Sequence, residues 1–296
     1  MILGAHCSTA GGVHRALDRA EQIGALSCQI FVKNNMQWSA RKYTEAEIQK
    51  FKERRVGSKC GVVFGHTGYL INVAAPESEN RERSIQSLVL EIELAAQLGV
   101  PFLVLHPGAH LGAGEEAGLR QAADALNNVF NATRKLPVRI ALENTAGQGT
   151  CLGHDLQHLK AVYQRVRRPE RLGVCLDTAH CFAADYDVRT EAGWNGVVEA
   201  VAAAVGLDQI LAIHLNDSKT PLGSRVDRHA GIGQGHIGRD AFAHIVNDPR
   251  FAEHPGCLET PKSADLHEDI ENLAVLRSLV RSRQGKLPKV DRARVK

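Results

Sequence analysis

The chain has 296 residues, of which 44% are hydrophobic and 23% are charged, and its formal net charge at pH 7 is +3. These values are typical of a soluble globular protein with a full hydrophobic core, and they exclude a disordered or collagen-like chain. No apolar run approaches the roughly 20 residues that a membrane helix needs, and the N-terminal sequence MILGAHCSTAGG lacks the layout of a signal peptide. We therefore expect a cytoplasmic protein without a membrane partner.

Short apolar runs with the composition of β-strands alternate with segments of helical periodicity along the chain. The expected strands are residues 2–7, 26–32, 61–66, 102–107, 139–144, 172–177, 210–215 and 256–260. The expected helices are residues 13–24, 44–56, 80–98, 118–135, 155–167, 191–205, 239–247 and 265–281. Eight repeats of a strand and a helix predict one (β/α)8 TIM barrel over residues 1–282, with an open doubly wound sheet as the main alternative.

The C-terminal end of the chain has a different composition. From Arg277 onward, eight Lys or Arg residues face a single acidic residue, Asp291. We expect residues 283–296 to form a basic tail that is solvated, in preference to an arm that binds nucleic acid. The seven cysteines contain no C-x-x-C pair, so neither a disulfide framework nor a Cys-rich zinc site is indicated.

Six of the expected strands end in a potential metal ligand. A closed barrel brings the ends of its strands into one ring, whereas an open sheet spreads them along a line. Convergence of these side chains on metal ions therefore favours the closed barrel. The six residues are His66, His106, Glu143, Asp177, His214 and Glu259.

Two loops add three further candidates. CLDTAHCF contributes His180, and VDRHAG contributes Asp227 and His229, which point to the same side of an extended backbone while Arg228 faces away. Nine ligands are too many for one ion and suit two or three, with positions left open for water and substrate. Five imidazoles among the nine favour Zn²⁺, with Mn²⁺ as a possible substitute at one site, over Mg²⁺.

The remaining nine histidines are interpreted as structural, although His6, near the end of the first strand, is a possible partner of a metal ligand. The glycine-rich stretch GIGQGHIG does not directly follow an expected strand. We interpret it as a lead into the next helix, with glycines that allow close backbone approach, and not as a dinucleotide-binding loop.

Several motifs together resemble those of the endonuclease IV family, the zinc-dependent apurinic/apyrimidinic endonucleases. They include FVKNNMQW, GHTGYLINVA, ALENTAGQG, CLDTAHCFAADYD and VDRHAGIGQGHIG, and the likeness runs from about residue 2 to residue 280. The resemblance implies a (β/α)8 barrel with three zinc ions. It assigns His66, His106 and Glu143 to the first ion, and Asp177, His214, Glu259 and bridging Glu143 to the second. It assigns His180, Asp227 and His229 to the third.

The resemblance also implies contacts with damaged double-stranded DNA. Tyr69 and Leu70 match positions that fill the space beside the damaged nucleotide, a role that suits an apolar wedge. Lys33, Asn34 and Met36 lie in a second DNA-binding loop, and Arg228 would face phosphates. Met36 stands where family members commonly carry an arginine, so it can act as a wedge but forfeits the phosphate or base contacts of that arginine.

The implied reaction is hydrolysis of the phosphodiester 5′ to an abasic site in DNA repair, which leaves a 3′-hydroxyl and a 5′-deoxyribose phosphate. Glu143 and Glu259 are the expected catalytic carboxylates, and trimming of blocked 3′ ends is expected as well. A chain that supplies all nine ligands needs no protein partner, so we expect a monomer. The alternatives are a metal-dependent sugar isomerase or epimerase of the same barrel fold and a DNA-binding protein without catalysis.

Overall fold

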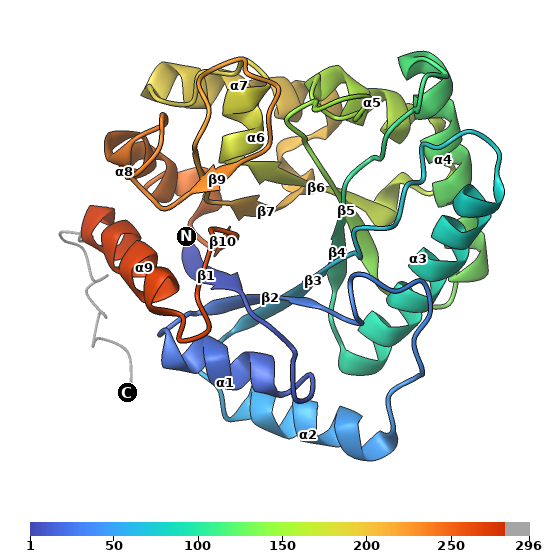
Figure 1. Cartoon of the computed structure of the whole chain (residues 1–296), viewed down its shortest axis with the longest axis horizontal. Helices are drawn as coiled ribbons and strands as arrows, with labels where there is room; N and C mark the ends of the chain where they lie inside the picture. The colour runs from blue at the N-terminus through green and yellow to red at the C-terminus, as the bar shows by residue number, and fades with distance from the viewer. Residues whose placement is uncertain (282–296) are drawn as a thin grey trace, which may run out of the picture.

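The protein is a closed barrel of eight parallel strands in this computed structural model, which describes residues 1–281 (Figure 1). The basic tail expected at 283–296 lies outside the described residues. Around the barrel the strand order is β1-β10-β7-β6-β5-β4-β3-β2, so the predicted closure is confirmed and the open sheet is wrong. The strands are β1 (Ile2–His6), β2 (Ser27–Phe31), β3 (Val62–His66), β4 (Phe102–Leu105), β5 (Arg139–Glu143), β6 (Leu172–Asp177), β7 (Ile210–His214) and β10 (Pro255–Leu258).

Helices surround the barrel, and each expected helical segment overlaps one, although the third and fourth begin one and three residues before their expected segments (Figure 1). These helices are α1 (Arg15–Gln22), α2 (Glu45–Val56), α3 (Glu79–Leu98), α4 (Glu115–Ala132), α5 (Leu156–Arg165), α7 (Glu191–Val205), α8 (Arg239–Val246) and α9 (His267–Leu279). Short 3-10 helices, η1 (Pro169–Arg171), η2 (Leu207–Gln209) and η3 (Pro249–Phe251), precede β6, β7 and β10. None of the helices within residues 1–281 is both long enough and apolar enough to cross a membrane.

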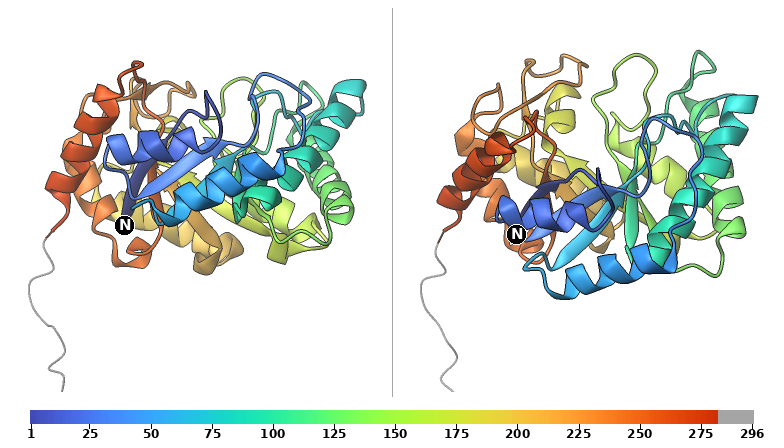
Figure 2. Two further views of the ribbon diagram at one scale, coloured as in Figure 1. Left: turned by 90° about the horizontal axis from the view of Figure 1, so that it is seen from below. Right: turned by 60° about the horizontal axis from the view of Figure 1, so that its bottom comes forward.

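Three short elements were not expected from the sequence. Helix α6 (Thr178–Ala183) follows β6 directly, and strands β8 (Asp217–Ser218) and β9 (His229–Ala230) form a two-stranded antiparallel sheet after β7. All three lie beyond the carboxyl ends of barrel strands, where long loops gather at one end of the molecule (Figure 2). We call this end the mouth of the barrel.

The interior of the barrel is filled by a compact set of buried side chains. Phe64 and Phe102 stack in its middle, with ring centroids 5.0 Å apart. Because successive side chains of a strand point to opposite faces, the residue two positions after an inward-facing one also points inward. The buried set consists of Phe64, Phe102, Val104, Ala141, Cys175, Ala212 and Cys257. Where one of these residues lies near the mouth, the residue two positions later in its strand also points inward and lies one layer closer to the mouth.

Candidate metal centre

The six strand-end candidates occupy that layer closer to the mouth, each two residues beyond a member of the buried set. His66, Glu143, Asp177 and His214 are the last residues of their strands. β4 and β10 end two residues earlier than expected, so His106 and Glu259 follow their strands directly. The two-residue period of the strands thus places all six candidates on the inner surface at the mouth.

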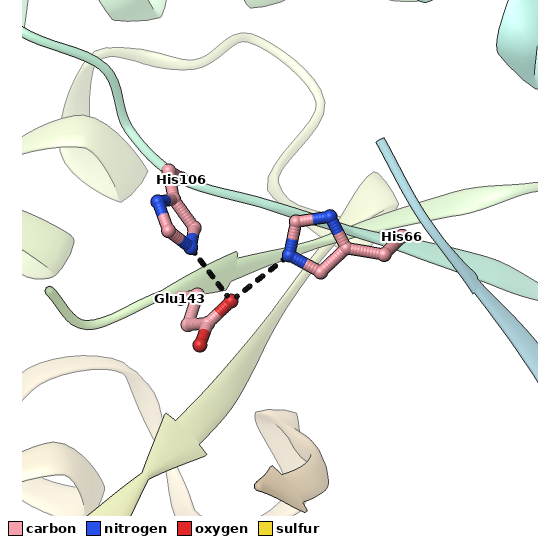
Figure 3. Close-up of side chains that lie close together, drawn as sticks. All are labelled: His66, His106 and Glu143. Atoms are coloured by element: carbon pink, nitrogen blue, oxygen red, sulfur yellow. Dashed lines mark hydrogen bonds and ion pairs between the residues drawn. The ribbon is translucent and has the colours of Figure 1, made fainter. Parts of the chain in front are cut away.

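The first group is His66, His106 and Glu143. The Oε2 atom of Glu143 lies 3.3 Å from Nε2 of His66 and 3.2 Å from Nε2 of His106, with both rings directed at the carboxylate (Figure 3). Three side chains from three neighbouring strands therefore converge on one point. These are the residues that the resemblance assigns to the first ion.

The second group surrounds His214. Its Nδ1 atom lies 2.9 Å from Oε1 of Glu143, 3.1 Å from Oε2 of Glu259 and 3.8 Å from Oδ2 of Asp177. One ligand atom from each of these four residues can be chosen so that all lie within 4.8 Å of one another. Glu143 belongs to both groups, as expected for a carboxylate that bridges two ions.

The third group includes the two loop residues. Oδ2 of Asp227 lies 3.2 Å from Nε2 of His180, and Oδ1 lies 3.2 Å from Nε2 of His229, so Asp227 and His229 do reach the same place. Asp177 also approaches this group, because one ligand atom each from Asp177, His180 and His229 lie within 4.8 Å of one another. The structure therefore brings all nine candidates into one connected cluster, with Asp177 between the second and third groups.

The hydrogen bonds of the histidines select the ring nitrogen that is available to a metal. Nδ1 of His66 lies 2.8 Å from the Thr67 carbonyl oxygen. Nδ1 of His180 lies 2.9 Å from the carbonyl oxygen of Asn144, and Nδ1 of His229 lies 3.2 Å from that of Glu259. Since a carbonyl only accepts, Nδ1 carries the proton in each neutral ring and the Nε2 lone pair faces the cluster.

His214 has the opposite arrangement with the same result. Its Nε2 atom lies 2.7 Å from Oε1 of Gln29, which leaves the Nδ1 lone pair facing the carboxylates of Glu143 and Glu259. A lone pair directed at a carboxylate is repulsive unless a proton or a metal ion lies between them. Nε2 of His180 and of His229 are buried and lie 3.2 Å from the oxygens of Asp227, but neither has a partner in hydrogen-bonding geometry among the described residues, as expected for metal ligands.

The carboxylates of the cluster need a compensating positive charge. Burial alone would raise the pKa of Glu143, but the positive charges of His214 and His106 hold it well below its usual value. Burial alone would lower the pKa of His229, but Asp177 and Asp227 raise it to about 9. Protons supply this charge when no ion is bound, and a divalent ion would displace them, so the donor set fits a metal of the zinc class.

Three supporting residues had not been singled out from the sequence. Gln29 contacts His6 Nδ1 at 2.8 Å, donates to Glu259 and contacts His214. Asn216 donates to Oδ2 of Asp177 at 2.7 Å, and its Oδ1 accepts the N–H of Glu259 at 2.8 Å. Gln29 could have been recognised as a polar residue at an inward-facing position of an apolar strand, whereas Asn216 carries no comparable signal.

Asp217 is the third of them, and it organises the glycine-rich stretch. Its buried carboxylate accepts N–H groups from Gly233, Gly235, Ile237 and Gly238 at 2.9 to 3.4 Å. A methyl group at Gly235 would lie 2.5 Å from Oδ1 of Asp217, so the expected close backbone approach is observed. Because β8 begins at Asp217 and pairs with β9, this network also supports His229.

His6 lies beside the cluster, with its Nδ1 atom 3.6 Å from Oε1 of Glu259, which is the supporting position expected for it.

A separate group of Glu115, His154 and His158 also brings two histidines to a carboxylate, but its hydrogen bonds do not suit a metal ion. Nδ1 of His158 accepts the N–H of Gly153 at 3.1 Å, so the neutral ring carries its proton on Nε2, the atom that faces Glu115. This tautomer binds the carboxylate and offers no lone pair there to an ion.

The cluster opens into a pocket of about 900 Å³ at the mouth, which Asn34, Tyr69 and Arg228 help to line. Met36 and Tyr69 are 63% and 66% exposed, and Leu70 is half-buried. Lys33, also expected as a DNA contact, lines the same pocket, but its ammonium group is buried and lies 3.0 Å from Oε1 of Glu91.

Comparison with known proteins finds relatives along nearly the whole chain. Residues 17–279 match the family model of xylose isomerase-like TIM barrels. A protein named probable endonuclease 4 from Chloroflexus aurantiacus is 48% identical over 277 residues, which are 94% of this chain and 97% of that protein. The crystal structure of endonuclease IV from Thermus thermophilus is 36% identical, covers 94% of this chain and 98% of its own, and has a TM-score of 0.83.

A D-tagatose 3-epimerase-like protein has a TM-score of 0.70 at 17% identity, over 95% of this chain and 98% of its own, and this likeness shows a shared fold alone. The two endonucleases, by contrast, are 48% and 36% identical to this chain over almost the full length of both proteins. The chain belongs to the endonuclease IV family.

Proposed function

We propose that this protein is a zinc-dependent endonuclease that hydrolyses the phosphodiester 5′ to an abasic site in double-stranded DNA. The main support is the connected cluster of nine nitrogen and oxygen donors at the floor of an open pocket. Its three groups share Glu143 and Asp177, which suits ions close enough to act on one phosphate. The products would be a 3′-hydroxyl and a 5′-deoxyribose phosphate, and blocked 3′ ends are further expected substrates.

His66, His106 and Glu143 would hold the first zinc ion, and Glu143, Asp177, His214 and Glu259 the second. His180, Asp227 and His229 would hold the third, with Asp177 in reach. When bound, closely spaced zinc ions activate water as a nucleophile and stabilise negative charge on the phosphate and the leaving oxygen. Mn²⁺ is a possible replacement at one site.

The residues of this chain supply positioning and charge for that chemistry. Glu143 and Glu259 are the proposed catalytic carboxylates, because both lie within 3.1 Å of Nδ1 of His214 at the centre of the cluster. Backbone carbonyls fix the rings of His180 and His229, so no ring needs to turn when substrate binds. The donors are thus arranged before the reaction starts.

The exposed side chains at the mouth suit recognition of an abasic site. Tyr69 is held edge-on against Phe31, with ring centroids 5.3 Å apart, and still exposes most of its surface. With Leu70 and Met36 it would fill the gap that a missing base leaves in the duplex. Asn34 and Arg228 line the same pocket and would contact the DNA backbone.

Cleavage of a duplex that contains one abasic analogue tests the proposal. The protein with its bound metal should nick the strand 5′ to the lesion, and prolonged treatment with a chelator should abolish cleavage until zinc is restored. Cleavage that survives the loss of all metal would contradict the zinc mechanism. Epimerisation of a free ketose without nicking of the duplex would instead indicate the sugar-epimerase alternative.

A further inference from the structure

Two loops at the mouth lie side by side, and each presents one strongly exposed large hydrophobic side chain. The β2–α2 loop (residues 32–44) carries Met36, and the β3–α3 loop (residues 67–78) carries Tyr69. They are joined directly, because the N–H of Tyr69 donates to the carbonyl oxygen of Asn35 at 3.1 Å. The spacing of the two exposed side chains therefore depends on what holds these loops together.

A buried ion pair lies beneath this junction. Nζ of Lys33 is 3.0 Å from Oε1 of Glu91, and the two side chains are only 3% and 1% exposed. The same ammonium group donates to the carbonyl oxygens of Asn34 and Gln37, on either side of Met36. Lys33 thus fixes the course of the loop that carries Met36.

Glu91 connects this arrangement to the second loop. It lies within α3, and its two carboxylate oxygens are 3.2 and 3.1 Å from the N–H of Gly68, the residue before Tyr69. One carboxylate therefore holds Lys33 from the first loop and the backbone of the second. Burial raises the pKa of Glu91 above its usual value in spite of the nearby ammonium, so an ionised carboxylate here depends on these partners.

Gly68 closes the junction at a point where even a methyl group would fit only tightly. A methyl group at this position would lie 3.1 Å from the carbonyl oxygen of Asn35 and 3.2 Å from both Oε1 of Glu91 and Nζ of Lys33. A larger residue here would force the second loop or the ion pair to shift by a few tenths of an ångström. Lys33, Gly68 and Glu91 form one unit, which we call the loop junction.

We propose that the loop junction is a positioning device that sets the spacing of Met36 and Tyr69 for recognition of the DNA lesion. The inference rests on the proposed function and assigns to Lys33 and Glu91 a role without contact to the DNA. A buried ion pair adds little net stability over apolar side chains of similar size, which favours a role in geometry. Eight of the nine candidate ligands lie on other strands and loops, and the ninth, His66, is fixed at the end of β3 with its Nδ1 atom 2.8 Å from the Thr67 carbonyl oxygen. The effect should therefore concern duplex binding and not the hydrolytic step.

The chain offers a matched control for this test. Lys42 and Glu93 link the same β2–α2 loop to the same helix α3, with Nζ and Oε2 3.1 Å apart, but they are 66% and 38% exposed. Glu91→Gln and Glu93→Gln therefore make the same chemical change two residues apart. Only the first removes charge from the loop junction.

The experiment measures cleavage of an abasic duplex, fluorescence of 2-aminopurine placed opposite the lesion, and hydrolysis of bis(4-nitrophenyl) phosphate by the full chain with its metals. Glu91→Gln should raise the KM for the duplex about tenfold or more and reduce the fluorescence change. It should leave hydrolysis of the small diester within about twofold, since that substrate does not need the loops. Glu93→Gln should match the wild type in all three measurements.

Two further variants keep the inference testable if Glu91→Gln folds poorly. The double variant Lys33→Met with Glu91→Leu leaves no unpaired buried charge, and Gly68→Ala keeps both charges but separates the loops. Each should raise the KM for the duplex. Equal effects of Glu91→Gln and Glu93→Gln on the duplex would overturn the inference, as would a parallel loss on both substrates. If the wild type hydrolyses the small diester but does not cleave the abasic duplex, the proposed function itself is wrong, and the inference that rests on it is wrong too.

Discussion

The metal centre has two parts that are built differently. Glu143, Asp177 and His214 end barrel strands and are fully buried, whereas Asp227 and His229 come from a long loop and are 41% and 14% exposed. The barrel fixes the first part because neighbouring strands are hydrogen-bonded all round. The second part depends on β8, β9 and the Asp217 network. We therefore expect the strand-held part to keep its ions under conditions that empty the loop-held part.

The largest effect should follow from a change at the bridging carboxylate of the strand-held part. Glu143→Gln removes a ligand shared by two groups, and we expect turnover on the abasic duplex to fall by about a thousandfold. Elemental analysis of the purified variant should show the loss of zinc. Glu115→Gln is the control, because Glu115 also faces two histidines but lies outside the centre, and an equal loss there would contradict the assignment.

A change in the loop-held part should be smaller and more selective. His229→Ala should reduce turnover by about a hundredfold and remove one zinc ion per chain, with the strand-held ions retained. Metal content and initial rate measured on the same preparation check both statements. His154→Ala should change neither, and loss of all zinc from His229→Ala would show that the two parts do not load independently.

A change to the Asp217 network, which supports the loop that carries His229 but includes no metal ligand, should further separate the loop-held part from the strand-held part. Asp217→Asn weakens the acceptor of four backbone N–H groups of the glycine-rich stretch, so we expect about a tenfold loss of metal affinity at the third group alone. Timed release of zinc into a dilute chelator should show one fast ion and two slow ones. The exposed change Asp240→Asn should leave the release unchanged, and uniform release from Asp217→Asn would contradict the role of this network.

A change outside the barrel should affect stability and neither part of the centre. The indole N–H of Trp194, in α7, donates to Oδ2 of Asp248 at 2.8 Å, and both residues are buried. Asp248→Ala should lower the free energy of unfolding by about 1 to 3 kcal/mol, because it leaves that N–H without its partner. Urea unfolding measures the change, and zinc content and turnover should remain those of the wild type.

The pH dependence of the same contact has a defined sign. Burial alone would raise the pKa of Asp248, but hydrogen bonds from Arg250 and Trp194 hold it below its usual value of 3.8. The stabilisation is therefore complete above that value and is lost as the pH falls through the lowered pKa. The difference in unfolding free energy between the wild type and Asp248→Ala should shrink in that range, and a difference that grows with acidity would contradict it.

The alternation of apolar strand runs with helical segments was enough to predict the barrel and the strand-held candidates, because each of these candidates ends an apolar run. It did not predict β8, β9 or α6, whose formation depends on contacts such as the backbone N–H groups gathered by Asp217. The burial of Lys33 was missed for a similar reason. Its partner Glu91 is far away along the chain and lies on a helix that otherwise follows its expected pattern.

The stacked rings of Phe64 and Phe102 affect how solvent, metal ions and substrate reach the candidate metal centre. They and their neighbours fill the barrel interior below the candidate metal centre, so we expect water, ions and the proposed DNA substrate to approach the centre from the mouth. A duplex seated there would cover the ions as well as the lesion. Zinc should then exchange more slowly in the DNA complex than in the free protein, and the nicked product would have to leave before the centre could be reloaded.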